Sequence, residues 1–378
     1  LEIRLMVIKG EMLGEVINQN GINIYILLYI KYPEIKAITQ IIISITKKYI
    51  KLNTNESPYP PSAKTTEAAR RESEKLNLYS DPTAKVLKTK IAETYGVEYE
   101  NVFVSNGSDE ILEFFFMAFC SEREVAYPEI SYGFYPVYAQ LFNSVSTVIP
   151  LKDDLSVDFE DYKGINKNIV IANPNAPTGI ALSKKQIEEI LLSNPDNLVL
   201  IDEAYVDFGA ESCTELIKKY KNLVVCMTFS KSRSLAGGRL GFCFADKAVI
   251  EDLEKIKYST NPYNVNRMTQ ACGAACMEDN GYYMENARKI IKTREYLTEE
   301  YRKLGFFVTD SRANFIFAKH SGISGEELYK ELKENGILVR HFTKEKISDF
   351  VRISIGTEEE IKTLVEKTKE ILSKRGRI

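Results

Sequence analysis

The chain contains no tryptophan and only two histidines, His320 and His341, among its 378 residues. With so few imidazoles, the sequence does not favour catalysis or metal binding centred on histidine. Six cysteines are present, but none forms a Cys-x-x-Cys pair, and Cys272 and Cys276, four residues apart, have no histidine nearby. The sequence therefore predicts buried thiols in a reducing, cytoplasmic environment, with neither a disulfide framework nor a metal site.

Long apolar runs and an excess of one charge are also absent. Residues 22–30 and 38–45 are mostly apolar, but charged residues separate them, and neither run reaches the roughly 18 to 20 residues of a membrane span. The net charge of −3 gives no basic footprint for nucleic acid. We therefore expect neither a membrane nor a nucleic acid as a partner. The hydrophobic and charged contents, 44% and 27%, are those of an ordinary soluble protein.

What the chain does have is a regular alternation of strand and helix patterns. This alternation predicts parallel βαβ units in an α/β fold, with helices covering both faces of one mostly parallel sheet. We place this large domain at residues 63–262 and a smaller α/β domain at residues 263–378. Residues 49–62 would join the small domain, and residues 1–48 form an extension to which we assign no chemistry.

Polar residues follow the ends of the predicted strands. In sheets of this kind, ligands bind beyond the carboxyl ends of the strands. The topology therefore brings these residues toward one crevice, although they are far apart in the sequence. The group comprises Asn106–Asp109, Tyr132, Asn173–Gly179, Asp202, Tyr205 and Lys231.

Lys231 is the residue around which the other candidates are organised. The apolar run Leu223–Phe229 predicts a buried strand that delivers Ser230 and Lys231 to its end. Burying a charged lysine at that place costs free energy unless the amine is neutralised or takes part in chemistry. Taken alone, it is compatible with a solvated lysine at a strand end, whereas its simplest chemical use is an imine with an aldehyde cofactor.

The neighbouring residues suit one such cofactor. Asp202 offers a carboxylate and Tyr132 a flat aromatic face, although Asp202 alone is also typical of a helix cap or a metal ligand. The turn before the helix expected at Glu110 exposes backbone N–H groups, which form an anion cradle or a plain helix cap. A planar, phosphorylated aldehyde with a ring nitrogen would use all of these groups. That ligand is pyridoxal 5′-phosphate (PLP), and its phosphate seat would comprise Gly107, Ser108, Ser230 and Arg239.

Three segments carry a family resemblance. Asn173–Gly179, Asp202–Tyr205 and Thr228–Arg239 resemble the corresponding segments of fold-type I PLP-dependent aminotransferases. The resemblance extends from about Tyr49 to the C-terminus. It implies a large domain with a mostly parallel, seven-stranded sheet, a smaller α/β domain, and PLP as the cofactor.

Within this family, the sequences of four segments are similar to those of the histidinol-phosphate aminotransferases. These segments are residues 52–56, 202–208, 228–231 and 351–357. The resemblance implies transamination of L-histidinol phosphate or imidazole-acetol phosphate with 2-oxoglutarate or glutamate, in histidine biosynthesis.

The same resemblance implies a role for each cofactor residue. Lys231 would form the imine with PLP and move the proton between the substrate Cα and the cofactor. Asp202 would hold the ring nitrogen, Tyr205 would bond the ring oxygen, and Tyr132 would stack on the ring. The phosphate would be surrounded by Gly107, Ser108, Asp109, Thr228, Ser230 and Arg239.

The resemblance also implies residues for the substrate and for a second subunit. Arg352 would grip the anionic end of the substrate, since a guanidinium meets carboxylate or phosphate with two bonds. Arg340 would bind the same anionic end together with Arg352, or else would be a surface residue without a role in binding. Asn55 is also assigned to the substrate. Tyr79 matches a tyrosine that reaches the partner subunit's phosphate, which implies a homodimer.

Two places depart from the family pattern. The family has asparagine immediately before Pro-Thr-Gly, where this chain has Ala176. We therefore assign the ring oxygen to Asn175 as a substitute, or to Tyr205 with less help. The N-terminal residues do not resemble the family's arm, and none of the tyrosines at positions 25, 29 and 32 can be assigned to the substrate.

Other functions remain open at this stage. A threonine-phosphate decarboxylase is a lyase with the same fold, and residues 52–56 favour the transferase over it. A broader aromatic-amino-acid aminotransferase is a third hypothesis. A non-enzymatic PLP-fold binding module is a fourth, for which residues 1–48 are short and weakly basic as a DNA-binding addition.

Overall fold

The chain was analysed as a computed structural model. It describes residues 2–8, 11–17, 23–28 and 49–376. Contacts divide the chain into two compact units, Leu1–Ile50 and Lys51–Ile378. The first unit contains an antiparallel sheet in the order β1-β2-β3, formed by β1 (Glu2–Ile8), β2 (Glu11–Ile17) and β3 (Asn23–Leu28). Most of the remaining extension, including Tyr29 and Tyr32, lies outside the described residues.

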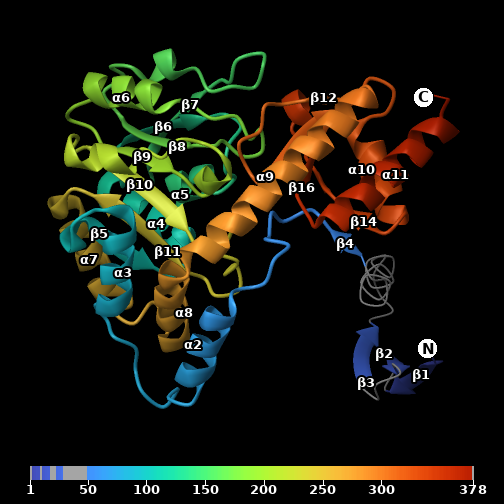
Figure 1. Ribbon diagram of the computed structural model, residues 1–378, viewed down its shortest axis with the longest axis horizontal. Helices are drawn as coiled ribbons and strands as arrows, with labels where there is room; N and C mark the ends of the chain where they lie inside the picture. The colour runs from blue at the N-terminus through green and yellow to red at the C-terminus, as the bar shows by residue number, and fades with distance from the viewer. Residues whose placement is uncertain (1, 9–10, 18–22, 29–48, 377–378) are drawn as a thin grey trace. The chain divides into compact units, whose positions relative to one another are not determined.

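The second unit is built on a seven-stranded sheet in the order β5-β11-β10-β9-β8-β6-β7 (Figure 1). Only β11 is antiparallel, and it pairs with both β5 and β10. The predicted α/β fold with a mostly parallel sheet is therefore confirmed. Its strands are β5 (Val102–Ser105), β6 (Glu124–Pro128), β7 (Val145–Ile149), β8 (Asn168–Ala172), β9 (Val199–Asp202), β10 (Leu223–Thr228) and β11 (Gly241–Ala245).

The central strands read as unbroken apolar runs because helices cover both of their faces. Every residue of β8, β9 and β10 is buried, as expected for parallel strands. Since the strand is pleated, Val224 and Val225 of β10 point into opposite cores. The covering helices are α3 (Lys85–Tyr95) and α6 (Lys184–Ser193) on one face, and α4 (Ser108–Phe115), α5 (Tyr135–Leu141) and α7 (Lys247–Thr260) on the other.

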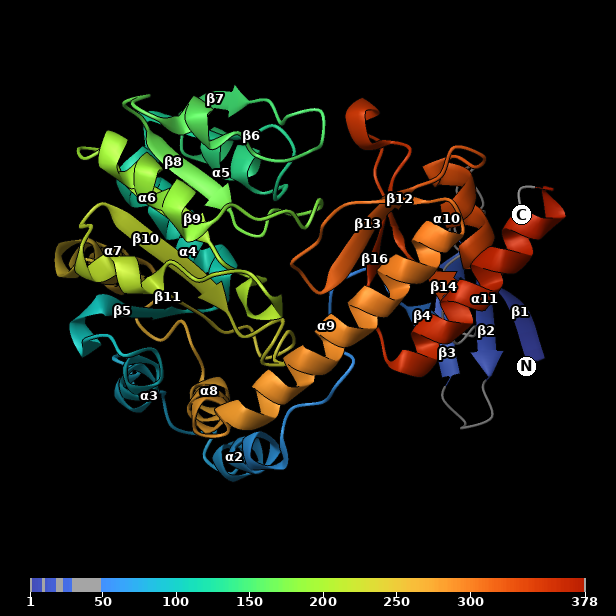
Figure 2. The same cartoon turned by 45° about the horizontal axis from the view of Figure 1, so that its top comes forward.

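After residue 264 the chain continues into two consecutive helices. α8 (Arg267–Glu278) and α9 (Asn280–Lys303) are separated at Asp279, which leaves the helical conformation. α8 packs against α2 (Ala63–Ser73) and α3, whereas α9 runs on to the small sheet (Figure 2). The domain boundary at residue 263 stays a prediction, and the packing of α8 places that helix beside the large sheet.

The small sheet is antiparallel and positions two arginines. Its order is β12-β13-β16-β15, formed by β12 (Phe307–Val308), β13 (Phe315–Lys319), β16 (Val351–Ser354) and β15 (Arg340–His341). β14 (Ile337–Leu338) follows α10 (Gly325–Glu334), and α11 (Glu358–Lys374) ends the described chain. Ser324 and Thr357 begin α10 and α11 with capping boxes.

The segment after β4 (Ile50–Lys51) is held by this small layer. The Leu52 amide donates to the Leu338 carbonyl over 2.8 Å, and the Leu52 carbonyl accepts from the Ser354 amide over 3.0 Å. These bonds fix the backbone that leads to Asn55.

Helix α4 begins at Ser108, two residues before the expected start at Glu110, and α5 begins at Tyr135. Among the mostly polar residues 153–163, Leu155, Val157 and Tyr162 are buried. The six free cysteines are all buried, as predicted. Within the described parts of the chain, no helix is long and apolar enough to cross a membrane.

Candidate active site

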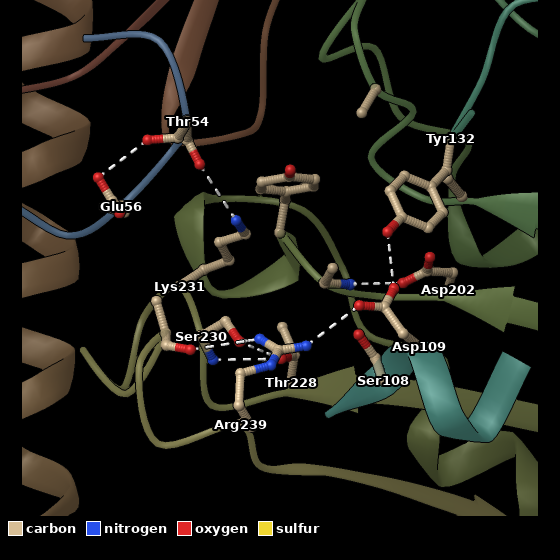
Figure 3. A pocket seen from close by; sticks show the side chains of 15 residues that line it. Thr54, Glu56, Ser108, Asp109, Tyr132, Asp202, Thr228, Ser230, Lys231 and Arg239 are labelled. Atoms are coloured by element: carbon tan, nitrogen blue, oxygen red, sulfur yellow. Dashed lines mark hydrogen bonds and ion pairs between the residues drawn. The ribbon is translucent and has the colours of Figure 1, made fainter. Parts of the chain in front are cut away.

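A cavity of about 200 Å³ lies beyond the carboxyl ends of the central strands (Figure 3). A water molecule takes up roughly 30 Å³, so this space admits a small organic ligand. Lys231 and Asp202 line the same cavity, as the cofactor hypothesis requires. The predicted cofactor residues that line it are Ser108, Asp109, Tyr132, Asp202, Tyr205, Thr228, Ser230, Lys231 and Arg239.

A second cavity, of about 650 Å³, lies beside the first. Its walls include the three predicted substrate residues, Asn55, Arg340 and Arg352. Five residues border both cavities, so a ligand in one would face a ligand in the other. They are Thr54, Tyr132, Ala176, Tyr205 and Lys231.

Asp202 is a buried carboxylate at the end of β9, with neutral hydrogen-bond donors. Its Oδ2 accepts from the Tyr135 hydroxyl over 3.0 Å and its Oδ1 from the Ala204 amide over 3.1 Å. Burial raises the pKa of Asp202 to about 6. A buried negative charge is stabilised by an opposite charge, so the site suits a protonated ring nitrogen.

The first turn of α4 and Arg239 form a positively polarised corner. The N–H groups at the start of an α-helix attract anions, and α4 begins directly after Gly107. A Cβ at Gly107 would lie 2.6 Å from Nη2 of Arg239, and a Cβ at Gly241 would lie 2.4 Å from the Ser108 nitrogen. Gly107 therefore allows the arginine to approach the helix start, and Gly241 allows β11 to pack closely against the same helix start. The resulting corner suits a phosphate.

Side chains around this corner hold one another in place. The Arg239 guanidinium donates to Oδ2 of Asp109 over 3.1 Å, and the Tyr132 hydroxyl donates to Oδ1 of the same carboxylate over 2.6 Å (Figure 3). Arg239 also donates to the Ser230 hydroxyl over 3.4 Å. Asp109 therefore orients both the arginine and the aromatic ring through its side chain.

Lys231 and Tyr205 meet where the two cavities join. Lys231 Nζ lies 3.5 Å from the Thr54 carbonyl oxygen and 5.7 Å from the centre of the Tyr205 ring. The Tyr205 hydroxyl accepts from the Asn55 side chain over 3.0 Å. The phenol is therefore oriented by a residue of the substrate cavity.

Three predicted cofactor residues do not line the cofactor cavity: Gly107, Asn175 and Tyr79. Ala176 lines it, but Asn175 does not. The Asn175 amide donates to the Ile130 carbonyl over 2.9 Å, and its oxygen accepts from the Ser131 hydroxyl over 2.7 Å. Asn175 therefore joins two loops rather than replacing the missing asparagine. Tyr79 is 79% exposed and stacks on another tyrosine, away from the cavity of its own chain.

The sequence reasoning missed several residues of this site, among them Thr54, which borders both cavities. Glu56 lines the cofactor cavity and accepts from Lys51 over 2.6 Å and from Thr54 over 2.9 Å. Tyr135 is the hydroxyl donor to Asp202. Glu56 could have been found from the segment 52–56. That segment indicated the histidinol-phosphate aminotransferases, but no chemical role was assigned to Glu56.

Arg352 is a half-buried cation with unused hydrogen-bonding capacity. Its Nη2 donates to the Asn53 carbonyl over 3.0 Å, while its buried Nε has no hydrogen-bond partner among the described residues. Burial lowers the pKa of Arg352. Arg340 is its cross-strand neighbour, and both guanidinium groups lie over the Phe342 ring. Two adjacent cations, one of them incompletely bonded, form a seat for an anion.

Comparison with known proteins agrees with this geometry. Residues 47–367 match the family described as aminotransferase class I and II. The chain belongs to this family. PLP is the cofactor of these aminotransferases, and the buried carboxylate, the lysine and the anion corner fit that group.

The most similar relatives include two histidinol-phosphate aminotransferases. The one from Brachyspira hyodysenteriae is 50% identical over 329 residues, which cover 86% of this chain and 93% of that protein. The one from Clostridium acetobutylicum is 47% identical over 329 residues, covering 86% and 94%. The solved structure of histidinol-phosphate aminotransferase from Sinorhizobium meliloti, in complex with pyridoxal-5′-phosphate, has a TM-score of 0.81 at 21% identity, covering 92% of this chain and 98% of that chain.

A buried acid next to Asp202 gives this aminotransferase a pH-dependent stability. Burial raises the pKa of Glu203 from 4.5 to about 7. Between these values the folded protein holds the proton that the unfolded chain releases, so the free energy of unfolding falls as the pH rises, by up to about 3 kcal/mol. We expect Glu203→Gln to reduce that fall. Urea unfolding of the cofactor-free protein at pH 4.5 and pH 7 measures it.

Glu211→Gln is the matched control, since Glu211 is an exposed acid in the following loop. It should leave the pH dependence of unfolding as it is in the native protein. Equal pH dependence in Glu203→Gln and the native protein would show that Glu203 does not titrate in this window.

Proposed function

We propose that this chain catalyses PLP-dependent amino transfer between L-histidinol phosphate or imidazole-acetol phosphate and 2-oxoglutarate or glutamate, in histidine biosynthesis. The observation that carries the proposal is the half-buried Arg352, whose buried Nε has no hydrogen-bond partner among the described residues. It lies in a cavity that shares Lys231 with the cofactor cavity. Such a seat accepts a phosphomonoester and a dicarboxylate in turn. The histidinol-phosphate aminotransferases among the relatives, 47–50% identical, support the same substrate.

The residues that would hold PLP are those of the first cavity. When bound, PLP supplies an aldehyde and a ring that accepts electrons. Lys231 would hold the aldehyde end, Asp202 the ring nitrogen, and Tyr205 the ring oxygen. The phosphate would lie against the helix start at Ser108 and against Arg239, with Thr228 and Ser230 beside it.

Four side chains would carry the chemical work. The Lys231 amine would take the proton from the substrate Cα as a general base and then, as a general acid, deliver it to the carbon of the cofactor's aldehyde group. Asp202 would keep the ring nitrogen protonated through a buried ionic contact. Arg352 and Arg340 orient the substrate by its anionic end, which places its Cα beside Lys231.

A substrate panel tests the proposal. Purified protein with PLP is offered histidinol phosphate, threonine phosphate and phenylalanine, with 2-oxoglutarate as the acceptor. We expect glutamate to form fastest with histidinol phosphate. Carbon dioxide released from threonine phosphate would indicate the decarboxylase instead, and faster turnover of phenylalanine would indicate the aromatic enzyme. Bound PLP without amino transfer from any donor would indicate a binding module.

Removing the Arg352 guanidinium should weaken both half-reactions. Truncating one partner of a buried charge pair costs about 2–5 kcal/mol, so Arg352→Ala should lower kcat/KM by about 30-fold or more. Arg352→Lys keeps the charge but loses the two-bond fork, and should fall in between. Steady-state kinetics with histidinol phosphate and with 2-oxoglutarate measure both. Arg312→Lys, at an exposed arginine in a different cavity, is the control, and native values in Arg352→Ala would disprove the anion seat.

We further propose that the active form is a cytoplasmic homodimer. Tyr79, exposed in one chain, would then complete the phosphate site of its partner. Lys231→Ala and Tyr79→Ala subunits, each impaired alone, should regain about a quarter of the native activity when mixed, because each heterodimer contains one intact site. Mixing Lys231→Ala with the double variant should restore nothing. No recovery in the first mixture would mean that Tyr79 serves only its own chain.

A further inference from the structure

The two segments that carry Asp202 and Lys231 are joined by a carboxylate that lines no part of the cofactor cavity. Asp207 lies in the short helix η4 (Val206–Phe208), two residues after Tyr205. Its Oδ2 accepts a 2.5 Å hydrogen bond from the Ser232 hydroxyl and lies 3.7 Å from Nη1 of Arg233. Ser232 and Arg233 directly follow Lys231, so Asp207 holds the backbone that presents the amine.

Arg233 depends on this carboxylate. Its side chain is only 3% exposed, and its Nε has no hydrogen-bond partner among the residues that the structure describes. Its remaining contacts are weak, with the Tyr95 hydroxyl at 3.4 Å and the Met284 sulfur at 3.8 Å. A buried guanidinium of this kind is strongly destabilised when its acidic partner is removed. The ion pair therefore fixes Arg233, and with it the turn after Lys231.

The other end of the link is rigid. Arg294 of α9 donates from the same Nη1 to the Phe208 carbonyl over 2.7 Å and to the Ala313 carbonyl over 2.8 Å. η4 is thereby attached both to the long helix and to the loop before β13. Asp207 consequently stands on a fixed element and can hold the more irregular segment after Lys231, where Ser234 adopts a positive φ of 56°.

We propose that Asp207 is a positioning residue that sets the separation between the Lys231 amine and the Asp202 carboxylate. Through Ser232 and Arg233 it keeps both groups aligned on the two ends of one cofactor ring. The inference rests on the cofactor roles proposed above for Lys231 and Asp202. Asp207 itself touches neither cofactor nor substrate, since it borders a different cavity.

The test uses the PLP-loaded enzyme and three variants. Asp207→Ala removes both contacts, Asp207→Asn keeps an acceptor for Ser232 but removes the charge, and Ser232→Ala removes only the hydrogen bond. The visible circular dichroism of the bound cofactor, without substrate, reports its orientation. We expect a changed signal in all three variants, largest in Asp207→Ala. There kcat should fall by about 10- to 100-fold while KM stays nearly unchanged, since misplacement by about 1 Å has effects of this size.

Asp310→Asn is the control, because it removes an exposed carboxylate that pairs with Arg312 on the surface. It should match the native enzyme in signal and kcat. Should Asp207→Ala fail to fold, Ser232→Ala and Asp207→Asn decide the question. Native dichroism and native kcat in both of these would overturn the inference.

Failure of the inference can be told apart from failure of the proposed function. The dichroism is recorded without an amino substrate, so it does not depend on which substrate the enzyme uses. Lys231→Ala should lose the native cofactor signal altogether. If Lys231→Ala keeps that signal, the assigned role of Lys231 is wrong, whatever Asp207 does.

Discussion

Replacing Lys231 with alanine is expected to abolish amino transfer while leaving the fold intact. Lys231 is only half-buried. Among the described residues its Nζ makes one hydrogen bond, of 3.5 Å, with a backbone carbonyl and lies 5.7 Å from the centre of the Tyr205 ring, so its loss removes little packing. Proton transfer by a positioned side chain contributes up to about 10⁴-fold to the rate. Because the same amine would also hold the cofactor, we expect at least that loss in kcat. Steady-state assays with histidinol phosphate measure it, and thermal unfolding checks the fold.

The matched control is Lys185→Ala, which removes an exposed lysine from α6. Its kcat should equal that of the native enzyme. A Lys231→Ala enzyme that retains even a tenth of the native kcat would show that another group handles the substrate proton, and the proposed mechanism would have to be abandoned.

The second large effect is expected at Asp202. Asp202→Asn keeps the size of the side chain but removes the charge that would pair with the ring nitrogen. Loss of a buried ionic partner costs about 3–5 kcal/mol, which corresponds to roughly two to four orders of magnitude in kcat. Stopped-flow measurement of a single half-reaction isolates this step from product release.

Tyr135→Phe provides the comparison, because it removes one neutral hydrogen bond to Asp202 and keeps the charge. A neutral bond contributes about 1 kcal/mol, so its effect should be about fivefold. If Asp202→Asn and Tyr135→Phe had equally small effects, the carboxylate would be a structural hydrogen-bond acceptor and not the partner of a cationic ring.

Much of the fold and of the site could be predicted because the signals are local. The strands β8, β9 and β10 are buried on both faces, so each appears in the sequence as a short apolar run. Residues that directly follow such runs, as Lys231 does, reach the crevice through topology alone. Asp202, the last residue of its run, reaches it in the same way.

The rest could not be predicted because it depends on partners distant in the sequence. Whether Asn175 or Ala176 faces the cavity is decided by the carbonyl of Ile130, 45 positions away. The bond between Asp207 and Ser232 spans 25 positions. The unpartnered Nε of Arg352 is visible only once its surroundings are in place. No periodicity in the sequence contains this information.

The buried thiols can report on the order in which parts of the protein unfold locally. Burial raises the pKa of Cys120 to about 12 and that of Cys272 to about 11, and a thiol reacts with alkylating reagents only as the exposed thiolate. Cys226 and Cys243 lie opposite each other on the neighbouring strands β10 and β11 of the large sheet, whereas Cys272 lies in α8. The order in which these sulfurs are alkylated under native conditions would therefore show whether the helical layer detaches before the sheet comes apart.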